Sequence, residues 1–445
     1  MPGPRVDSVH GDEHLPEKVD VVVIGGGIVG ASTALELAER GIKVALCEKG
    51  GIGQEQSSRN WGWVRLSRRD PREIPLMIEA LRIWRTLDQR IGRDTGYNQA
   101  SITFACATET QFNTYAEWRR YLEPYQIESR MLNGDEFAGM FPDLSIKPYG
   151  ALHTPSDGRA EPQKAAPAIA EAAREKGAVI LTECAVRGLD LSAGRISGVI
   201  TERGAIACDA VVMAGGVWSN LFCRRYGIDV PQLNVMNSVL RTTPVEGGPE
   251  GALWTKAFAL RKRQDGGYTI ASGHENIVDI VPNSFRYALK FLPSFREEWR
   301  SLRFRLSGRF LEELLMAKAW EMDEASPFEY CRVLDPVPSK KYADGTLAKL
   351  AATWPIFAKA KIAQRWGGYI DVLPDAVPII SAADSIPGFH IATGFSGHGF
   401  GIAPAAGRLM ADIVTGRSPV VDPYHFRLAR FSDGSKIELM PDMRQ

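Results

Sequence analysis

The sequence predicts a mixed α/β fold built around a Rossmann-type dinucleotide-binding unit. Three observations support this prediction. A strand–glycine turn–helix–strand unit begins at residue 19, short strand-like runs broken by glycines occupy residues 178–208, and a glycine-rich loop at residues 394–401 leads into a helical run. Strands that alternate with helical segments are typical of a parallel sheet covered by helices. We therefore expect one cofactor site assembled from both ends of the chain.

The N-terminal unit has every part of a βαβ nucleotide-binding motif. Val19–Ile24 is a β-branched run typical of a strand buried on both faces, residues 28–40 have helical composition, and Lys43–Cys47 is a second apolar strand. Gly41 follows the helix, where a glycine commonly ends one. The turn before the helix has the GxGxxG pattern, with Gly25, Gly27 and Gly30. A lone GxGxxG is weak evidence, but the complete unit predicts dinucleotide binding.

Each part of this unit has a physical role in holding a dinucleotide. Gly25 permits the tight turn, Gly27 lets the backbone approach a pyrophosphate, and Gly30 lets the helix pack closely on the strand. The helix N-terminus offers unpaired N–H groups and a favourable dipole to the phosphates. Glu48 ends the second strand. An acid at that position accepts hydrogen bonds from the adenosine ribose and disfavours a 2′-phosphate.

Three further segments favour FAD over a nicotinamide dinucleotide. Residues 51–62 are dense in small, hydrogen-bonding side chains, residues 210–218 read as a strand ending in glycines, and the loop 394–401 precedes a helical run at 405–415. A glycine loop that feeds a helix N-terminus is suited to stabilising negative charge on a reduced flavin. The cofactor-binding residues predicted on these grounds are Gly25, Gly27, Ile28, Val29, Gly30, Glu48, Lys49, Gln56, Ser57, Ser58, Arg59, Asn60, Ala214, Gly215, Trp218, Gly394, Gly397, His398, Gly399, Phe400 and Gly401.

These motifs resemble a known group of flavoenzymes. The stretches VDVVVIGGGIVG, LCEK, QSSRNWG, VVMAGGVW and IATGFSGHGFGIAPAAG are together similar to the glycine oxidase and D-amino acid oxidase (DAO) superfamily. Within it, the chain looks nearest to the bacterial L-amino acid deaminases, whose best-known members are membrane-associated. The resemblance covers most of the chain. It implies an FAD-binding domain interleaved with an antiparallel-sheet substrate domain that carries a helical insertion.

The resemblance also implies where the domains divide. We expect a flexible N-terminal tail at 1–17, a discontinuous FAD-binding domain at 18–100, 153–235 and 365–425, a substrate-binding domain at 101–152 and 236–364, a helical insertion at 284–322, and a C-terminal tail at 426–445.

The same resemblance supplies candidates for substrate binding. Arg261 lies on a predicted strand before an Asp-Gly-Gly turn and matches the carboxylate-binding arginine of the deaminases, with Arg263 as the alternative if the register differs. An arginine grips a carboxylate through two parallel hydrogen bonds. An exposed strand arginine without a ligand is the competing interpretation. Trp63, Val239 and Phe395 are expected to shape the substrate pocket.

His398 stands between two glycines of the loop expected beside the flavin, and we predict it to be a catalytic neighbour of the ring. The competing interpretation is a histidine that only orders the loop. The form GFSGHGFG departs from the deaminases and is similar to amine and sarcosine oxidases, and Val239-Leu240 is apolar where the deaminases carry amides. The identity of the substrate and its handedness at Cα therefore stay open.

Further positions complete the predicted site. The resemblance places Val186 at the adenine ring and Gly368 near the flavin ring, and Trp61 and Arg65 are weaker candidates for the pocket wall. Some relatives attach FAD through a cysteine, but residues 365–375 contain none, so noncovalent FAD is predicted. The two aspartates around Pro374, Asp371 and Asp375, are predicted to be turn residues.

The predicted activity is FAD-dependent oxidative deamination of an amino acid, with L-amino acids as the first candidates. The neutral amine would deliver the Cα hydride to flavin N5, and the imino acid would hydrolyse to a 2-oxo acid and ammonia. Electrons would pass to O2 or to a respiratory quinone or cytochrome. The alternatives are a D-amino acid or secondary-amine (sarcosine- or proline-like) oxidase or dehydrogenase, and a non-catalytic electron-transfer subunit of a larger dehydrogenase.

The segment Ser284–Met322 is rich in aromatic residues, leucines and, in its first part, arginines and lysines. One interpretation is an amphipathic helical pair that caps the substrate domain. The other is a surface that contacts an anionic membrane or an electron-accepting partner. The hydrophobic N-terminal helix of the deaminases is missing, which weakens a membrane location.

Charge and cysteine content exclude other classes of protein. The 445-residue chain has 53 Lys+Arg and 53 Asp+Glu, which argues against nucleic-acid binding. No apolar run approaches a membrane span, and the first 17 residues lack a signal-peptide core. Six cysteines without CxxC or metal-type spacing predict reduced thiols, no metal site and a cytoplasmic protein, with peripheral contact at the inner face of the membrane as an alternative.

Overall fold

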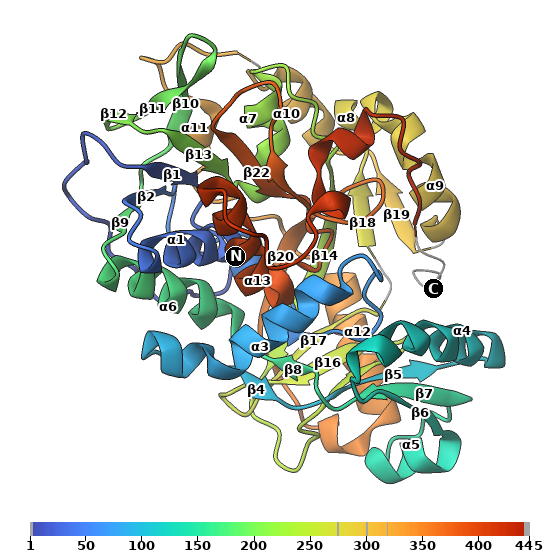
Figure 1. The fold of residues 1–445 in the computed structure, drawn as a ribbon. Helices are drawn as coiled ribbons and strands as arrows, with labels where there is room; N and C mark the ends of the chain where they lie inside the picture. Colours follow the sequence, from blue (N-terminus) through green and yellow to red (C-terminus); the bar gives the residue numbers. More distant parts are fainter. Residues whose placement is uncertain (1–2, 274–275, 300, 318, 440–445) are drawn as a thin grey trace.

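The computed structural model describes residues 3–273, 276–299, 301–317 and 319–439, which are arranged around two main sheets (Figure 1). The first sheet has the strand order β21-β22-β13-β1-β2-β9 and is parallel except between β21 and β22. Its strands are β1 (Val21–Ile24), β2 (Val44–Cys47), β9 (Val179–Leu181), β13 (Ala210–Met213), β21 (Ile379–Ala382) and β22 (Phe389–Thr393). All residues of β1, β2 and β13 are buried, as their apolar runs predict.

Helices from three parts of the chain pack together on one side of this sheet. α1 (Ile28–Glu39) contacts both α6 (Pro162–Glu175) and α13 (Gly399–Thr415). A Cβ added at Gly407 of α13 would lie 2.6 Å from the backbone of Ser32 in α1, so these two helices approach closely. The start, middle and end of the chain therefore share one core, as a discontinuous FAD-binding domain requires.

A second, smaller sheet packs on the first. It is the predicted meander, with β10 (Val186–Ser192), β11 (Arg195–Thr201) and β12 (Gly204–Ala207) in antiparallel order. Side chains of this sheet, such as Val199, share a buried cluster with Val22 of β1. The alternating pattern of the sequence reflects this one buried face.

The other main sheet is mostly antiparallel, as predicted, with the order β19-β18-β14-β17-β16-β15-β5-β7-β6 and with β20 paired to β14. The pairs β5–β15 and β18–β19 are parallel. Its strands are β5 (Ile102–Cys106), β6 (Arg130–Asn133), β7 (Gly150–Thr154), β14 (Leu233–Thr242), β15 (Ala252–Trp254), β16 (Ala259–Lys262), β17 (Tyr268–Ala271), β18 (Asn276–Asp279), β19 (Leu302–Arg305) and β20 (Ile362–Val372). The flanking elements are α3 (Ile74–Ile91), α4 (Glu109–Arg119), α5 (Gly134–Met140), α12 (Lys340–Thr353) and the small sheet β3 (Trp63–Val64), β8 (Gly158–Arg159) and β4 (Asn98–Gln99).

Three expected domain boundaries fall inside strands. The boundary at 152/153 lies within β7, the one at 235/236 within β14, and the one at 364/365 within β20. β14 and β20 pair along most of their length, with Val239 opposite Trp366. Long strands rather than linkers therefore carry the chain across these expected boundaries, and the domain division stays a prediction.

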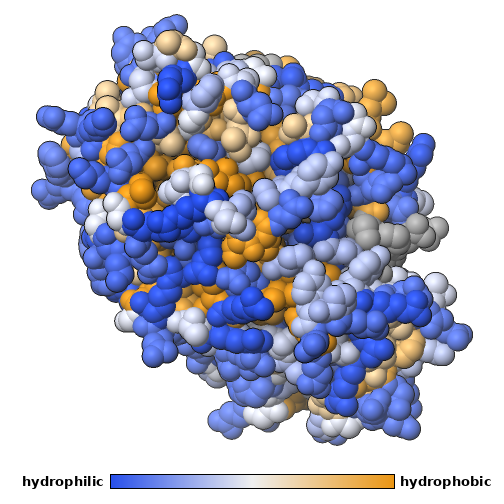
Figure 2. All heavy atoms as spheres, in the orientation of Figure 1, coloured by the Kyte–Doolittle hydropathy of each residue, from blue (hydrophilic) through white to orange (hydrophobic). Residues whose placement is uncertain are grey.

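The predicted helical insertion contains a strand as well as helices. α8 (Pro282–Arg286), α9 (Ala288–Glu298) and α10 (Arg309–Leu315) accompany β19, which lies at the edge of the large sheet. Residues 300 and 318 lie outside the described part. The exposed large apolar side chains of the segment are Phe285, Leu289, Leu292, Phe295, Trp299, Phe304, Leu306, Leu311, Leu314 and Leu315. Figure 2 shows apolar side chains among polar ones at the upper right, where these helices lie in Figure 1.

Within residues 3–17, expected to be a flexible tail, two aspartates make hydrogen bonds to the FAD-binding body. The Asp7 amide donates to the Gln163 carbonyl over 3.0 Å, the Asp12 amide donates to the Ile180 carbonyl over 2.7 Å, and Asp12 Oδ2 accepts from the Ile180 amide over 2.7 Å. These contacts fasten the segment along α6 and β9. Residues 1 and 2 lie outside the described part.

The C-terminal segment is also anchored. Arg430 is 6% exposed and its Nε lies 2.8 Å from Oδ2 of Asp375, which occupies the predicted turn. Residues 440–445 lie outside the described part. Within the described chain, no helix is both long and apolar enough to cross a bilayer.

Candidate active site

A cavity of about 420 Å³ is lined by residues from both main sheets, and most of the predicted site lines it. The predicted cofactor residues in its wall are Gly25, Gly27, Ile28, Val29, Glu48, Lys49, Gln56, Ser57, Arg59, Asn60, Val186, Ala214, Gly215, Trp218, Gly368, Gly397, His398, Gly399, Phe400 and Gly401. The predicted substrate residues in its wall are Trp63, Val239 and Phe395. Gly30, Ser58, Gly394 and Arg261 are absent from its lining.

The glycine turn after β1 forms one end of the cavity. Gly25 has a φ of 106°, and a Cβ there would lie 2.5 Å from the Ala214 carbonyl oxygen. A Cβ at Gly30 would lie 1.9 Å from the Gly25 carbonyl oxygen, so Gly30 shapes the turn from behind the lining. Gly27 caps α1 without any side-chain hydrogen bond. The turn is therefore a backbone cradle open to a phosphate group.

Glu48 lies beside this cradle, where the sequence predicts the ribose acid. Its Oε2 accepts the Gly26 amide over 2.7 Å and its Oε1 accepts the Gly50 amide over 2.7 Å. Burial raises the pKa of Glu48 above its ordinary value, against the opposing charge of Lys49. The carboxylate is thus fixed by two backbone donors at the edge of β2. A glycine cradle with an adjacent, oriented acid fits the adenosine diphosphate half of FAD.

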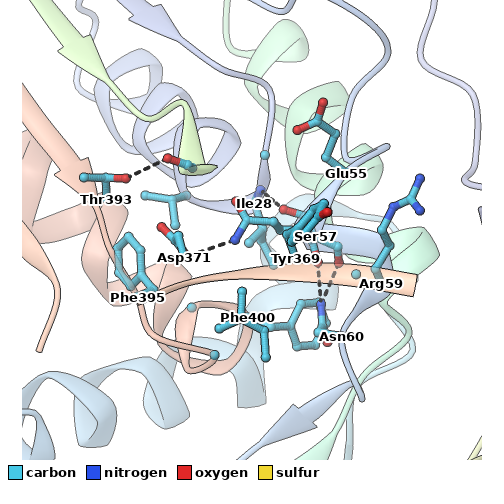
Figure 3. Close-up of a pocket in the computed structure, with 18 of the residues that line it drawn as sticks. Ile28, Glu55, Ser57, Arg59, Asn60, Tyr369, Asp371, Thr393, Phe395 and Phe400 are labelled. Carbon is cyan, nitrogen blue, oxygen red and sulfur yellow. Dashed lines mark hydrogen bonds between the residues drawn. The ribbon is translucent and has the colours of Figure 1, made fainter. Parts of the chain in front are cut away.

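The segment after the cradle is tied to the flavin end by hydrogen bonds (Figure 3). Ser57 Oγ accepts the Ile28 amide over 2.9 Å, and Gln56 Nε2 donates to Asp371 Oδ1 over 2.8 Å. Asp371 Oδ2 also accepts the Gly394 amide over 2.8 Å. Asp371 is 4% exposed, lies in β20 and lines the cavity. It is therefore a site residue, and its prediction as a turn residue is wrong.

The C-terminal glycine loop winds directly into α13. The helix begins at Gly399, six residues before its predicted start, because the glycines themselves adopt helical geometry. His398, the residue before it, is 8% exposed and lines the cavity. Burial and the neighbouring Arg69 lower the pKa of His398 to about 4, with Glu73 opposing them. The loop thus presents a helix N-terminus and a neutral imidazole, which fits a flavin ring.

Three arginines of the segment after β3 lie in the cavity wall near His398. Arg65, Arg68 and Arg69 all line the cavity. Burial, followed by the charges of Arg69 and Arg68, lowers the pKa of Arg65 to about 9. The segment follows β3 and is held by Asp157, whose Oδ1 accepts the Leu66 amide over 2.6 Å. An uncommon concentration of positive charge therefore faces the substrate end of the cavity.

Arg261 lies on β16, as predicted, but does not face the cavity. Its guanidinium is 1% exposed, its Nη1 lies 2.6 Å from Glu161 Oε1, and its Nε donates to the Trp61 carbonyl over 2.6 Å. Arg263 lies 3.7 Å from the same glutamate. The structure places Arg261 in an internal ion pair behind the Trp61 backbone and outside the cavity lining, so its carboxylate-binding role stays a prediction.

Aromatic rings form much of the remaining wall. The Trp61 and Trp63 ring centroids are 5.2 Å apart, and Phe104 lies 5.7 Å from Trp63, with an edge-on arrangement in both pairs. Arg68 lies over Phe104 at 5.1 Å and over Trp254 at 5.5 Å. Sequence analysis missed Arg68, Arg69, Phe104 and Trp254. The two missed arginines, five and six residues after Trp63, were a usable signal, whereas the two missed rings come from distant strands.

Comparisons with known proteins agree with this geometry. Among solved structures, L-amino acid deaminase from Proteus myxofaciens has a TM-score of 0.93 and 34% identity, covering 96% of this chain and 97% of that one. Glycine oxidase of Pseudomonas aeruginosa is 24% identical, over 91% of this chain and 96% of that protein. Sarcosine dehydrogenase of Mus musculus is 24% identical over 94% of this chain, but the chain spans only 42% of it.

A family model described as FAD dependent oxidoreductase (DAO) matches residues 20–413. That range includes the glycine cradle, the arginine segment, both long strands and the loop that carries His398. The cradle, the oriented acid and the helix N-terminus each fit a part of FAD, so fold, site and comparison lead to one conclusion. The chain belongs to the DAO family of FAD-dependent oxidoreductases.

Proposed function

We propose that the protein uses FAD to oxidise the carbon–nitrogen bond of a small amine that carries a carboxylate, with an L-amino acid as the first candidate substrate. The imine product would hydrolyse to a 2-oxo acid and ammonia. The observation that carries this proposal is the presence of Arg65 and Arg68 in the same cavity as the dinucleotide cradle. The likeness to L-amino acid deaminase supports the choice of first candidate.

Charge around the arginine segment favours an anionic ligand. Arg65, Arg68 and Arg69 all line the cavity. The charges of Arg69 and Arg68 help to lower the pKa of Arg65, so like charges crowd its guanidinium. A substrate carboxylate would relieve this repulsion, and a charge-assisted hydrogen bond to arginine contributes about 1.5–3 kcal/mol.

The positive charge at the substrate end also favours the neutral form of the substrate amine over its ammonium form. The carboxylates in the described lining are Glu48, Glu55 and Asp371, which all lie on the cofactor-binding segments. An ammonium group at the substrate end would face arginines, whose like charge lowers its pKa. When bound, FAD supplies the two-electron acceptor for the hydride of the carbon next to nitrogen. The chain's own part is to hold the carboxylate, favour the neutral amine and exclude water with Trp61, Trp63 and Phe104.

Anaerobic reduction of the flavin tests the proposal. Purified holoprotein is mixed with matched L- and D-amino acids, sarcosine and proline, and the flavin absorbance is followed. We expect bleaching by one enantiomeric set. Arg65→Met should weaken the binding of that substrate by about tenfold or more, since one charge-assisted hydrogen bond is lost. A flavin that no amino acid or amine reduces would contradict the proposal and favour the electron-transfer alternative.

A secondary amine is the second candidate. Sarcosine dehydrogenase and glycine oxidase are among the relatives, and Val239, which lines the cavity, offers no hydrogen bond to a primary amine. Preferential bleaching by sarcosine or proline in the same assay would select this candidate.

Three further properties belong to the proposal. FAD is held noncovalently, so acid precipitation should release all of it into the supernatant. The electron acceptor is O2 or a respiratory quinone or cytochrome. Measuring oxygen consumption and quinone reduction during turnover distinguishes these acceptors. The insertion contacts an anionic membrane through its exposed apolar and basic residues, supported by Phe285, Leu289 and Arg286 at its surface. Flotation with anionic and neutral liposomes at low salt tests that contact, and no flotation would contradict it.

A further inference from the structure

A buried carboxylate behind the cavity wall, that of Glu73, lies between the arginine segment and His398. Glu73 is fully buried before the first turn of α3, and neither of its carboxylate oxygens makes a hydrogen bond with the described residues. Its Oε2 lies 3.5 Å from Nδ1 of His398 and 3.8 Å from Nη1 of Arg69. A buried ionised group normally has close partners, so this placement calls for an explanation.

Arg69 fixes the geometry of this group. Its Nη2 donates to the His398 carbonyl over 3.0 Å and its Nε donates to the Arg65 carbonyl over 3.1 Å. Its own carbonyl accepts Nε1 of Trp118 over 2.7 Å. The arginine segment and the loop before α13 are therefore joined through one side chain. The imidazole of His398 is held with Nδ1 turned toward Glu73.

Burial and two neighbouring arginines keep the ring of His398 neutral. The groups that act on it are Arg69, Glu73 and Arg65, and burial together with the two arginines lowers its pKa to about 4. For Glu73, burial opposes ionisation, but His398, Arg69 and Arg65 outweigh it and the pKa lies below its ordinary value. Near neutral pH a neutral imidazole thus faces an ionised carboxylate. Such a ring is a poor base for an ammonium group, but it has one nitrogen that donates and one that accepts.

We propose that Glu73 is a positioning residue that holds His398 as the Nδ1–H tautomer, so that Nε2 faces the cavity as an acceptor for an N–H of the substrate amine. A carboxylate beside Nδ1 attracts the ring proton to that nitrogen, and the lone pair is then on the opposite side of the ring. His398 lines the cavity, which gives Nε2 access to a ligand. The hydrogen bond orients the neutral amine while the arginines hold the carboxylate. The identity of the ligand in this inference rests on the proposed amine oxidation. The tautomer of His398 is independent of that function.

Nitrogen NMR of the histidine rings tests the proposal directly. Protein labelled with ¹⁵N-histidine is recorded with and without FAD, and His398→Asn identifies the His398 signals. We expect the Nδ1–H tautomer, unchanged between pH 5.5 and 8. Glu73→Gln should raise the Nε2–H fraction, because an amide attracts the proton less than a carboxylate does. Asp157→Asn is the matched control: it removes another buried carboxylate near the same arginines and should leave the tautomer unchanged.

Kinetics separate positioning from a structural role. Glu73→Gln should slow anaerobic flavin reduction about tenfold, the effect of one misplaced hydrogen bond, while the affinity for benzoate, an unreactive carboxylate, stays the same. Wild-type protein with the Nε2–H tautomer would overturn the proposal, even if the variant does not fold. A variant with wild-type tautomer and wild-type rate would also overturn it. Failure of the proposed function has a different signature, because then no amine reduces the flavin while the tautomer measurement still stands.

Discussion

Replacing Arg261 with methionine separates the two roles considered for this residue. The guanidinium is 1% exposed, pairs with Glu161 Oε1 at 2.6 Å and donates to the Trp61 carbonyl. Burial opposes ionisation of Glu161, but Arg261 and Arg263 outweigh it and keep its pKa below the ordinary value. Removing Arg261 leaves a buried carboxylate with Arg263, 3.7 Å away, as its remaining arginine. Fold stability, rather than substrate binding, should therefore change.

The size of the effect follows from the burial of the pair. Removing one partner of a buried ion pair typically costs about 3–5 kcal/mol, and we expect about 3 kcal/mol for Arg261→Met because Arg263 compensates in part. The double variant Arg261→Met/Glu161→Leu should lose less, since no uncompensated charge stays buried. Urea denaturation of the holoprotein measures both, and Arg65→Met is the comparison for substrate binding.

The outcome that would refute this reasoning is specific. If Arg261→Met unfolds at the wild-type urea concentration but binds benzoate a hundredfold more weakly, Arg261 is the carboxylate site after all. If benzoate affinity is unchanged and the unfolding midpoint falls, the ion pair with Glu161 is its role. Glu161→Gln should then behave like Arg261→Met, because each variant leaves the other partner buried.

The remaining predictions concern the cofactor end and pH. Gly30→Ala should abolish FAD binding measured by calorimetry, because its Cβ would lie 1.9 Å from the Gly25 carbonyl oxygen. Gly139→Ala is the control that keeps FAD, since a Cβ there would have no atom within 4 Å. Glu48→Gln should weaken FAD binding about tenfold by placing an amide donor against one of two backbone N–H groups, and unchanged affinity would remove its assigned role. Burial raises the pKa of Asp157 from 3.8 to about 6, so the native state holds this proton more tightly than the unfolded state. The contribution of Asp157 to the free energy of unfolding should fall by about 3 kcal/mol as pH rises from about 4 to 6. Urea denaturation at several pH values measures this fall. If Asp157→Asn shows the same dependence of unfolding free energy on pH, Asp157 is not its source.

The cofactor half of the site was predictable because its information is local. In the unit from Val19 to Glu48, strand, turn, helix and second strand follow one another, and each residue's role depends on backbone geometry within about thirty positions. Gly25 and Gly27 line the cavity as predicted. The glycine loop before α13 was equally recognisable, although the helix begins at Gly399, because glycines give no clear signal of where a helix starts.

The substrate half depends on contacts between distant segments. Sequence placed Arg261 correctly on a strand, but its partner Glu161 is a hundred positions away and no periodic pattern links them. Asp371 read as a turn residue because Pro374 follows it, whereas the pairing of β20 with β14 extends the strand to Val372. Phe104 and Trp254 meet Arg68 only because β5 and β15 are neighbours in the large sheet.

By itself, the sequence determined the flavin cradle, because the cradle follows from short-range spacing of glycines and apolar residues, and the same motifs carried the resemblance to the family. The tertiary structure decided which arginines are available to a ligand. An arginine's role depends on the carboxylate beside it, and only the fold brings Glu161 to Arg261 while leaving Arg65 on the cavity wall. Whether a buried charge is compensated depends on residues that are close in space, and these can be far apart in the sequence.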